Sequence, residues 1–343
     1  MKLDLYDTKI IRCLEEAYGL CIESLTLLPI GADFKTTVYR VAAPLGKSYF
    51  LKVRSGPFLE ASVTVPKYLW DLGARHVISP LPTKFGDLWL TLGAAKAVLY
   101  PYVEGHTGAG TPLSKEHWHD FGAAVKNLHL TGFPENVTQD IPKEQFSSTA
   151  GIVVKEFLTR IEGPPFETHV AKKTAAFLHS KSAEIRRIIE QTEILANILQ
   201  SRPLEKVLCH ADLHGWNLLI DQSSTLFIVD WDTLIFAPKE RDLMFVGAGI
   251  WDTTLSQAEE SAYFYAGYGQ ATINHEALCY YRFERILQDL EEYVTHIISS
   301  QREDAKSLAE SFHYLTSNFR ADGTIERAWA SWKIASSRAR GRS

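Results

Sequence analysis

The sequence is poor in cysteine and has no long apolar run, and each shortage excludes a class of protein. Four cysteines are spread over 343 residues, with no C-x-x-C pair among them. Disulfide frameworks belong to short secreted chains, so we expect reduced thiols and a cytoplasmic protein. No window approaches about 18 uninterrupted apolar residues, so no membrane-spanning helix is predicted. The first residues carry acids through their apolar positions and so lack the core of a signal peptide.

Basic residues are also in the minority. The chain has 36 Lys and Arg against 41 Asp and Glu, which gives a formal net charge of −5. A nucleic-acid-binding protein normally presents a basic face, so we expect no nucleic-acid partner. A mildly acidic surface instead suits a small cationic molecule. Apolar residues make 45% and charged residues 22% of an otherwise ordinary globular composition, and the length allows two domains or two lobes.

The spacing of apolar residues divides the chain into a β-rich first part and a helical second part. A helix over 7–18 precedes short alternating strands, and another helix is predicted at about 65–72. Ser114 can cap a helix over 115–129, after which helical patterns dominate. These patterns cover 149–162, 168–199, 256–271, 275–299 and 303–317. We therefore predict an α+β fold in four parts. They are an N-terminal lobe (1–100), a connection (101–105), a helical lobe (106–335) and a disordered basic tail (336–343).

Three acid or imidazole groups fall within five residues between two apolar runs. The stretch VLCHADLHGWNLLI holds His210, Asp212 and His214, then Asn217, and FIVDWD brings Asp230 on a second apolar run. The spacing fits H-x-D-x-x-x-x-N, the kinase catalytic-loop pattern without its Arg. Phosphoryl transfer asks mainly for positioning and charge neutralisation. We predict that Asp212 aligns the attacking hydroxyl and takes its proton, and that Asn217 and Asp230 bind Mg²⁺ beside ATP.

Two other interpretations of this cluster stay open. In a metal-dependent hydrolase, His210, Asp212 and His214 would bind zinc or manganese. The remaining histidines show no ligand-like spacing, so we expect His210 to brace the loop backbone and His214 to line the cleft. A surface loop of turn-forming residues is the other possibility, but the apolar runs on both sides disfavour it.

A kinase also needs a lysine on a strand of the first lobe. Lys52 in YFLKV lies between apolar neighbours, and we predict that it contacts the α- and β-phosphates of the nucleotide. Glu60 is the only acid between Lys52 and Asp71, so it is the predicted ion-pair partner. Pro66 is expected to start or kink the following helix, which would leave Glu60 on a preceding turn.

The predicted nucleotide loop, IGADFKTTVY, has one glycine where G-x-G-x-x-G has three. Gly31 can turn the chain, Gly31 and Asp33 are the candidate contacts in the loop, and the backbone amides that follow can cover phosphates. The connection between the lobes contains Pro101, Tyr102 and Val103. Adenine is expected to meet backbone N–H and C=O groups there.

Several stretches together resemble the aminoglycoside phosphotransferase family, whose fold is similar to that of protein kinases. They are CHADLHGWNLLI, FIVDWD, APKERDLMF, GADFKTTVYRV, YFLKV, GYG and YRFERILQDLEEY, and they run from about residue 10 to about 315. The resemblance implies a bilobal protein-kinase-like fold with ATP as phosphate donor and Mg²⁺ as cofactor. It implies Asp212 as the catalytic Asp, Asn217 and Asp230 as magnesium ligands and Lys52 as the phosphate-binding lysine. It also implies that Asp242 is a buried structural acid.

The resemblance further implies an acceptor hydroxyl on a small cationic aminocyclitol or aminoglycoside antibiotic. Spectinomycin is the expected substrate, and resistance is the expected outcome. Carboxylates should hold its ammonium groups, and the candidates beside Asp212 are Asp232, Glu284 and Asp289. For the last two, a solvated helix face paired with arginine is the alternative.

Two rivals to this function stay open, as does the oligomeric state. One is a kinase of another small hydroxyl metabolite, of the choline, homoserine or thio-sugar type, on the same fold. The other is a catalytically silent pseudokinase that only binds a nucleotide or a partner. We expect a monomer or a homodimer.

Overall fold

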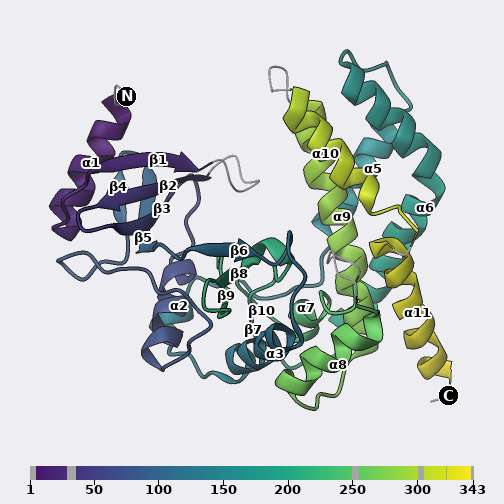
Figure 1. Ribbon diagram of the computed structural model, residues 1–343. Coiled ribbons are helices and arrows are strands. Elements are labelled where there is room, and N and C mark those ends of the chain that lie inside the picture. The colour runs from purple at the N-terminus through teal and green to yellow at the C-terminus, as the bar shows by residue number, and fades with distance from the viewer. Residues whose placement is uncertain (1–4, 29–35, 249–254, 300–304, 322, 341–343) are drawn as a thin grey trace. The chain divides into compact units, whose positions relative to one another are not determined.

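A computed structural model describes residues 5–28, 36–248, 255–299, 305–321 and 323–340 (Figure 1). The chain forms two compact units, Met1–Pro142 with His210–Ile235, and Lys143–Cys209 with Phe236–Ser343. The segment with the predicted catalytic motif therefore folds with the N-terminal residues, although it lies among helical segments in the sequence. The connection predicted at 101–105 lies inside the first unit.

The first unit contains a five-stranded antiparallel sheet in the order β1-β2-β3-β5-β4. Its strands are β1 (Ser24–Leu28), β2 (Thr36–Ala43), β3 (Lys47–Ser55), β4 (Leu90–Leu92) and β5 (Ala95–Pro101). On the central strand β3, Lys52 is opposite Val38 of β2 and Val98 of β5. Its neighbours Leu51 and Val53 are buried in the core of this sheet. Because side chains alternate along a strand, Lys52 lies on the other face.

Helix α1 (Leu5–Tyr18) covers the apolar face of this sheet. Ile10 and Leu14 are buried and belong to the same core as Leu51 and Val53. The helix predicted at 7–18 is thus confirmed, and its apolar spacing is what packs it against the strands.

Helix α2 (Ala61–Asp71) begins earlier than the predicted 65–72. Glu60 is its N-cap residue and already has helical backbone angles, while Pro66 lies inside the helix. A proline there removes one backbone hydrogen bond. The helix nevertheless continues because its apolar face, with Val63, Val65 and Leu69, is buried. The expectation that the helix starts near Pro66 is therefore wrong.

A smaller antiparallel sheet of the first unit holds the catalytic segment. Its order is β6-β8-β9, with β6 (Gly105–Thr107), β8 (Leu218–Asp221) and β9 (Leu226–Ile228). Gly105 pairs with Asp221, and a Cβ at Gly105 would lie 2.1 Å from the carbonyl oxygen of Ile220. A residue without a side chain is needed for so close an approach. A short helix α4 (Glu135–Thr138) and helix α3 (Lys115–Leu130) complete this unit. Ser114 caps α3 as predicted.

The second unit is helical apart from the short strands β7 (Val207–Cys209) and β10 (Ile235–Ala237), which pair with each other. Its helices are α5 (Thr149–Arg160), α6 (His169–Gln200), α7 (Glu240–Leu243), α8 (Gln257–Tyr268), α9 (His275–Ser299), α10 (Ala305–Ser317) and α11 (Thr324–Arg340). Helix α9 is central and contacts α5, α6, α7, α10 and α11. Among the helices of the described ranges, none combines the length and the apolar composition that a bilayer-spanning segment needs.

Helix α11 extends through positions 336–340, where a disordered tail is predicted from the sequence. Ile325, Ala328 and Ala335 are buried at helical spacing, and the Trp329 ring packs edge-on against Phe283 of α9 at 4.8 Å. Helix α11 therefore packs against α9 over residues 325–335 and continues into the small and polar residues that follow.

Replacing Gly105 with Ala should destabilise the first unit. The new methyl group would meet the Ile220 carbonyl at 2.1 Å, so β6 would have to move away from β8. Overpacking of this kind costs typically about 1–3 kcal/mol. Urea unfolding followed by circular dichroism measures the loss. Gly132→Ala is the matched control, because no described atom lies within 4 Å of a Cβ added there. Equal unfolding midpoints for the two variants would contradict the close approach.

Candidate functional site

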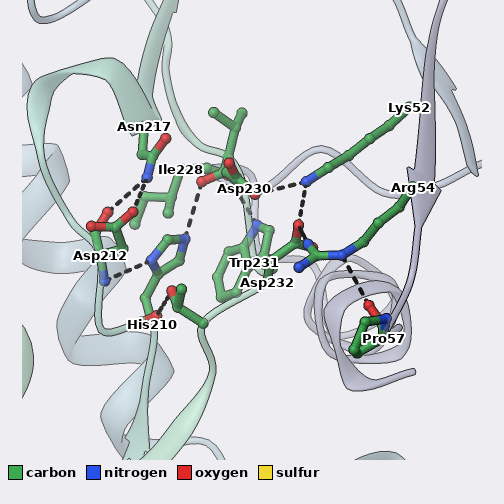
Figure 2. Close-up of polar contacts among 12 residues, drawn as sticks. Lys52, Arg54, Pro57, His210, Asp212, Asn217, Ile228, Asp230, Trp231 and Asp232 are labelled. Carbon is green, nitrogen blue, oxygen red and sulfur yellow. Dashed lines mark hydrogen bonds and ion pairs between the residues drawn. The ribbon is translucent and has the colours of Figure 1, made fainter. Parts of the chain in front are cut away.

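The ammonium group of Lys52 lies between two carboxylates that follow strand β9 (Figure 2). Its Nζ atom is 2.7 Å from Oδ1 of Asp230 and 2.7 Å from Oδ2 of Asp232. The guanidinium of Arg54, two residues further along β3, contacts the same oxygen of Asp232. Two cations and two anions thus meet in one cluster, and their formal charges cancel.

The cations and the carboxylates of this cluster shift each other's pKa values. Burial by itself would lower the pKa of Lys52, but the charges of Asp230 and Asp232 outweigh it and raise that pKa above its usual value. Burial would likewise raise the pKa of Asp230, but the nearby ammonium of Lys52 lowers it. Lys52 therefore stays a cation at neutral pH.

The backbone at Asp230 is left-handed, with φ +64°. Residues other than glycine seldom adopt this conformation, and Asp is among those that tolerate it best. The side chains of Asp230 and Asp232 turn toward Lys52, whereas Trp231 between them turns toward His210 (Figure 2). The Trp231 ring is buried, lies 4.9 Å from the His210 ring and donates from Nε1 to the Ile228 carbonyl at 3.2 Å.

His210 is fully buried and connects the catalytic loop with the segment after β9. Its Nε2 atom is 3.0 Å from the carbonyl oxygen of Val229, and its Nδ1 atom accepts from the backbone N–H of Asp212 at 3.3 Å. These partners favour the neutral ring with its proton on Nε2. The expected bracing role is confirmed. Both ring nitrogens are engaged with the backbone, which argues against His210 as a zinc or manganese ligand.

Asp212 and Asn217 are held together inside the loop. The Asn217 amide nitrogen donates to the Asp212 carbonyl at 2.8 Å and to its Oδ2 at 3.0 Å. His214 Nε2 lies 3.2 Å from the same Oδ2. Because the amide nitrogen of Asn217 is used in this way, its Oδ1 is the atom that can face a cation. These two contacts fix the direction of the Asp212 carboxylate.

The donor set fits a hard divalent cation. Asn217 directly precedes β8, Asp230 follows β9, and the N–H of Val229 donates to the Asn217 carbonyl at 3.0 Å. The backbone positions that carry the Asn217 amide and the Asp230 carboxylate are therefore adjacent. Mg²⁺ prefers oxygen ligands and keeps several waters, so two protein groups beside a phosphate suffice.

The predicted pair between Lys52 and Glu60 is not formed. Among the described residues, the carboxylates that contact Lys52 belong to Asp230 and Asp232. The Glu60 side chain is exposed at the start of α2, and its N–H donates to Asp140 at 2.7 Å. The acids after β9 reach the ammonium instead.

Sequence reasoning also missed Arg54. The signal was present in the K-x-R spacing on a strand, which sends both cations to the same face. The D-x-D spacing after β9 is its counterpart, because it provides two carboxylates for two cations.

The connecting segment follows β5, which ends at Pro101. Arg40 holds this segment: its guanidinium lies 4.4 Å from the centre of the Tyr102 ring and 2.7 Å from Glu104. Among the residues that the structure describes, the peptide groups of Val103 have no hydrogen-bond partner. Free peptide groups are what adenine binding would require here, and the nucleotide role of Pro101, Tyr102 and Val103 stays a prediction.

Four other predicted contacts are not part of the Lys52 cluster as described. Gly31 and Asp33 fall outside the described residues. Glu284 is buried on α9, and burial raises its pKa from 4.5 to about 7, against the effects of Ser148 and Arg241. Asp289 forms a 2.9 Å ion pair with Arg285, one turn away on the same helix. The substrate roles of Glu284 and Asp289 stay predictions.

Comparisons with known proteins bear on the family and the fold. A model of the "Phosphotransferase enzyme family" matches residues 25–280. The crystal structure of spectinomycin phosphotransferase APH(9)-Ia, in complex with ADP and spectinomycin, is similar with a TM-score of 0.86. It is 30% identical, over 94% of this chain and 98% of that chain. The α+β kinase-like fold, with an N-terminal antiparallel sheet and a largely helical C-terminal part, is thereby confirmed.

Two other matches are weaker, one in sequence identity and one in the share of the chain that it covers. Amicoumacin kinase hAmiN, in complex with AMP-PNP, Ca²⁺ and Ami, has a TM-score of 0.62 at 14% identity, over 92% of this chain and 95% of that chain, and shows the fold alone. Protein StrN of Streptomyces griseus is 26% identical over 183 residues, which are 51% of this chain. This chain thus matches 55% of the length of that curated relative.

Glu284→Gln should change how the stability of the second unit depends on pH. With a pKa raised from 4.5 to about 7, the folded protein keeps a proton that the unfolded chain releases. The stabilisation is therefore fully present below pH 4.5 and is lost as the pH rises through 7, by at most about 3 kcal/mol. Glutamine stays neutral and should remove this dependence.

Urea unfolding between about pH 5 and about pH 8 measures this effect as the free energy of unfolding. The free energy of unfolding of Glu284→Gln should increase relative to that of the wild type as the pH rises. Glu193→Gln, which removes an exposed partner of Lys155, is the control. Parallel curves for Glu284→Gln and wild type would contradict the raised pKa.

Proposed function

The chain belongs to the phosphotransferase enzyme family, and we propose that it is an ATP-dependent kinase that phosphorylates a hydroxyl of spectinomycin or a closely similar aminocyclitol. The observation that carries the catalytic part is that one unit holds both the Lys52–Asp230 ion pair and the Asn217–Asp212 hydrogen bond. The acceptor is supported by the 30% identity to spectinomycin phosphotransferase across 94% of the chain.

The reaction follows from what each side chain can do. The acceptor oxygen attacks the γ-phosphorus of ATP, the bond from that phosphorus to the β,γ-bridging oxygen breaks, and ADP leaves. Asp212 accepts a hydrogen bond from the acceptor hydroxyl and takes its proton as the new bond forms. The amide of Asn217 keeps the Asp212 carboxylate in place. Lys52 supplies a fixed positive charge for the phosphate oxygens of the nucleotide.

Asp230 and Asn217 would hold Mg²⁺, which supplies neutralisation of phosphate charge when it is bound. The lowered pKa of Asp230 suits this role, because the carboxyl is ionised at neutral pH. The amide oxygen of Asn217 adds a neutral ligand. Together they leave room for waters and phosphate oxygens.

The acceptor is a small dibasic molecule, and its ammonium groups need acidic partners. The net charge of −5 favours the approach of a cation. Asp212 offers one carboxylate at the reacting hydroxyl. Glu284 and Asp289 are the further candidates, and at Asp289 an ammonium group would compete with Arg285.

Purified protein with ATP, Mg²⁺ and spectinomycin should release ADP and yield a product heavier by one phosphoryl group. A coupled ADP assay and mass spectrometry measure the two. Streptomycin, kanamycin, choline, homoserine and a thio-sugar form the comparison panel. Efficient turnover of one of these compounds without turnover of spectinomycin would show that this compound, and not spectinomycin, is the acceptor. Failure to bind any adenine nucleotide would contradict the kinase itself.

Asp212→Asn should lower turnover by about 10²–10⁴-fold, the usual contribution of a general base. The amide keeps the shape of the side chain but cannot take the proton. Nucleotide affinity, measured by calorimetry with AMP-PNP, should stay close to that of the wild type. Asp120→Asn, at a half-exposed residue of α3 beside His119, is the matched control. Turnover near the wild-type rate would remove Asp212 from the mechanism.

A further inference from the structure

We propose that Asp232 is the positioning residue for Lys52, in the place that a helix acid fills in protein kinases, and that Arg54 fixes Asp232 in turn. This inference rests on the proposed kinase function, because the position of Lys52 matters for binding phosphates. In protein kinases the strand lysine is paired with a glutamate of the helix that follows. Here that contact is made by the second acid of D-W-D.

The contacts form a continuous chain. Arg54 donates from Nε to the Pro57 carbonyl at 3.0 Å, and its guanidinium contacts Asp232. The same oxygen of Asp232 lies 2.7 Å from Lys52 Nζ. A lysine has a flexible stem and loses side-chain entropy when its head is held. A carboxylate that a second cation holds in place restricts the motion of the Lys52 ammonium. A carboxylate that is free to move restricts it less.

Asp232 suits this task better than Asp230. Its side chain is 19% exposed, whereas that of Asp230 is 48% exposed, so the contact between Asp232 and Lys52 is screened less by solvent. The proposed mechanism also assigns Asp230 to a metal ion, which would compete with Lys52 for its oxygens. In the protein-kinase pattern D-F-G, the residue at the position of Asp232 is glycine, which offers no carboxylate.

Glu60 has a different environment. Its side chain is exposed and its backbone N–H is held by Asp140 at the start of α2. The predicted role of Asp232 as an ammonium ligand of the acceptor also conflicts with the cluster. An acceptor ammonium would bring a third cation to an oxygen that already contacts Lys52 and Arg54. Repulsion among these cations disfavours that arrangement.

The test compares Asp232→Asn with the wild type in the full-length protein. AMP-PNP binding in the presence of Mg²⁺ is measured by calorimetry, and kcat and the KM for ATP by ADP release. We expect the dissociation constant and the KM to rise about tenfold, the result of roughly 1.4 kcal/mol of lost interaction. Asp232→Glu should recover part of the loss. Asp71→Asn, which removes an exposed partner of Lys67, is the matched control.

A double-mutant cycle separates positioning from a general structural effect. If Asp232 acts through the lysine, Asp232→Asn should have little further effect on AMP-PNP affinity in a Lys52→Met background. Fully additive losses would overturn the inference, as would wild-type affinity and kcat in Asp232→Asn. A larger loss of AMP-PNP affinity from Glu60→Gln than from Asp232→Asn would show that Glu60, and not Asp232, positions Lys52.

The two proposals fail in different ways. A wild-type protein that binds AMP-PNP but phosphorylates nothing would overturn the proposed function. The calorimetric cycle would still decide whether Asp232 acts through Lys52. An active wild type with an unchanged Asp232→Asn variant would overturn this inference alone.

Discussion

A buried ammonium group is stable only where negative charge compensates the loss of water, and Lys52 obtains that charge from Asp230 and Asp232. Lys52 lies on the central strand of the larger sheet, and the two acids follow the last strand of the smaller one. Their contact therefore joins the catalytic segment to the larger sheet within the first unit. His210 is hydrogen-bonded to both Val229 and Asp212, and so it connects this segment to the catalytic loop.

The catalytic motif could be predicted because its information is local. The spacing from Asp212 to Asn217, and the apolar runs on both sides, can be seen without any knowledge of tertiary structure. The same holds for Ser114, since a cap and the helix it begins are neighbours in sequence. Long amphipathic helices were likewise predictable from their period. The family resemblance added the kinase-like fold, which composition and periodicity by themselves describe only as a β-rich part followed by helices.

The remaining features depend on distance in space. The two partners of Lys52 are separated from it by 178 and 180 residues in sequence, whereas the predicted partner Glu60 was the nearest acid. Helix α2 runs through Pro66 because burial of its apolar face outweighs a lost hydrogen bond. Only the end of helix α11, positions 336–340, has a composition typical of a tail, and it continues a helix that packs on α9. In each case tertiary packing overrides the local signal, which is where reasoning from a single sequence ends.

The left-handed turn at Asp230 has a consequence for how this region can evolve. It lets two carboxylates, one residue apart, face Lys52 while the indole between them fills the space beside His210. A different apolar side chain in place of Trp231 would preserve that alternation. Insertion or deletion of a single residue would not, because it would change which side chains face Lys52 and which one faces His210. The number of residues in this segment is therefore constrained more tightly than the identity of its middle one.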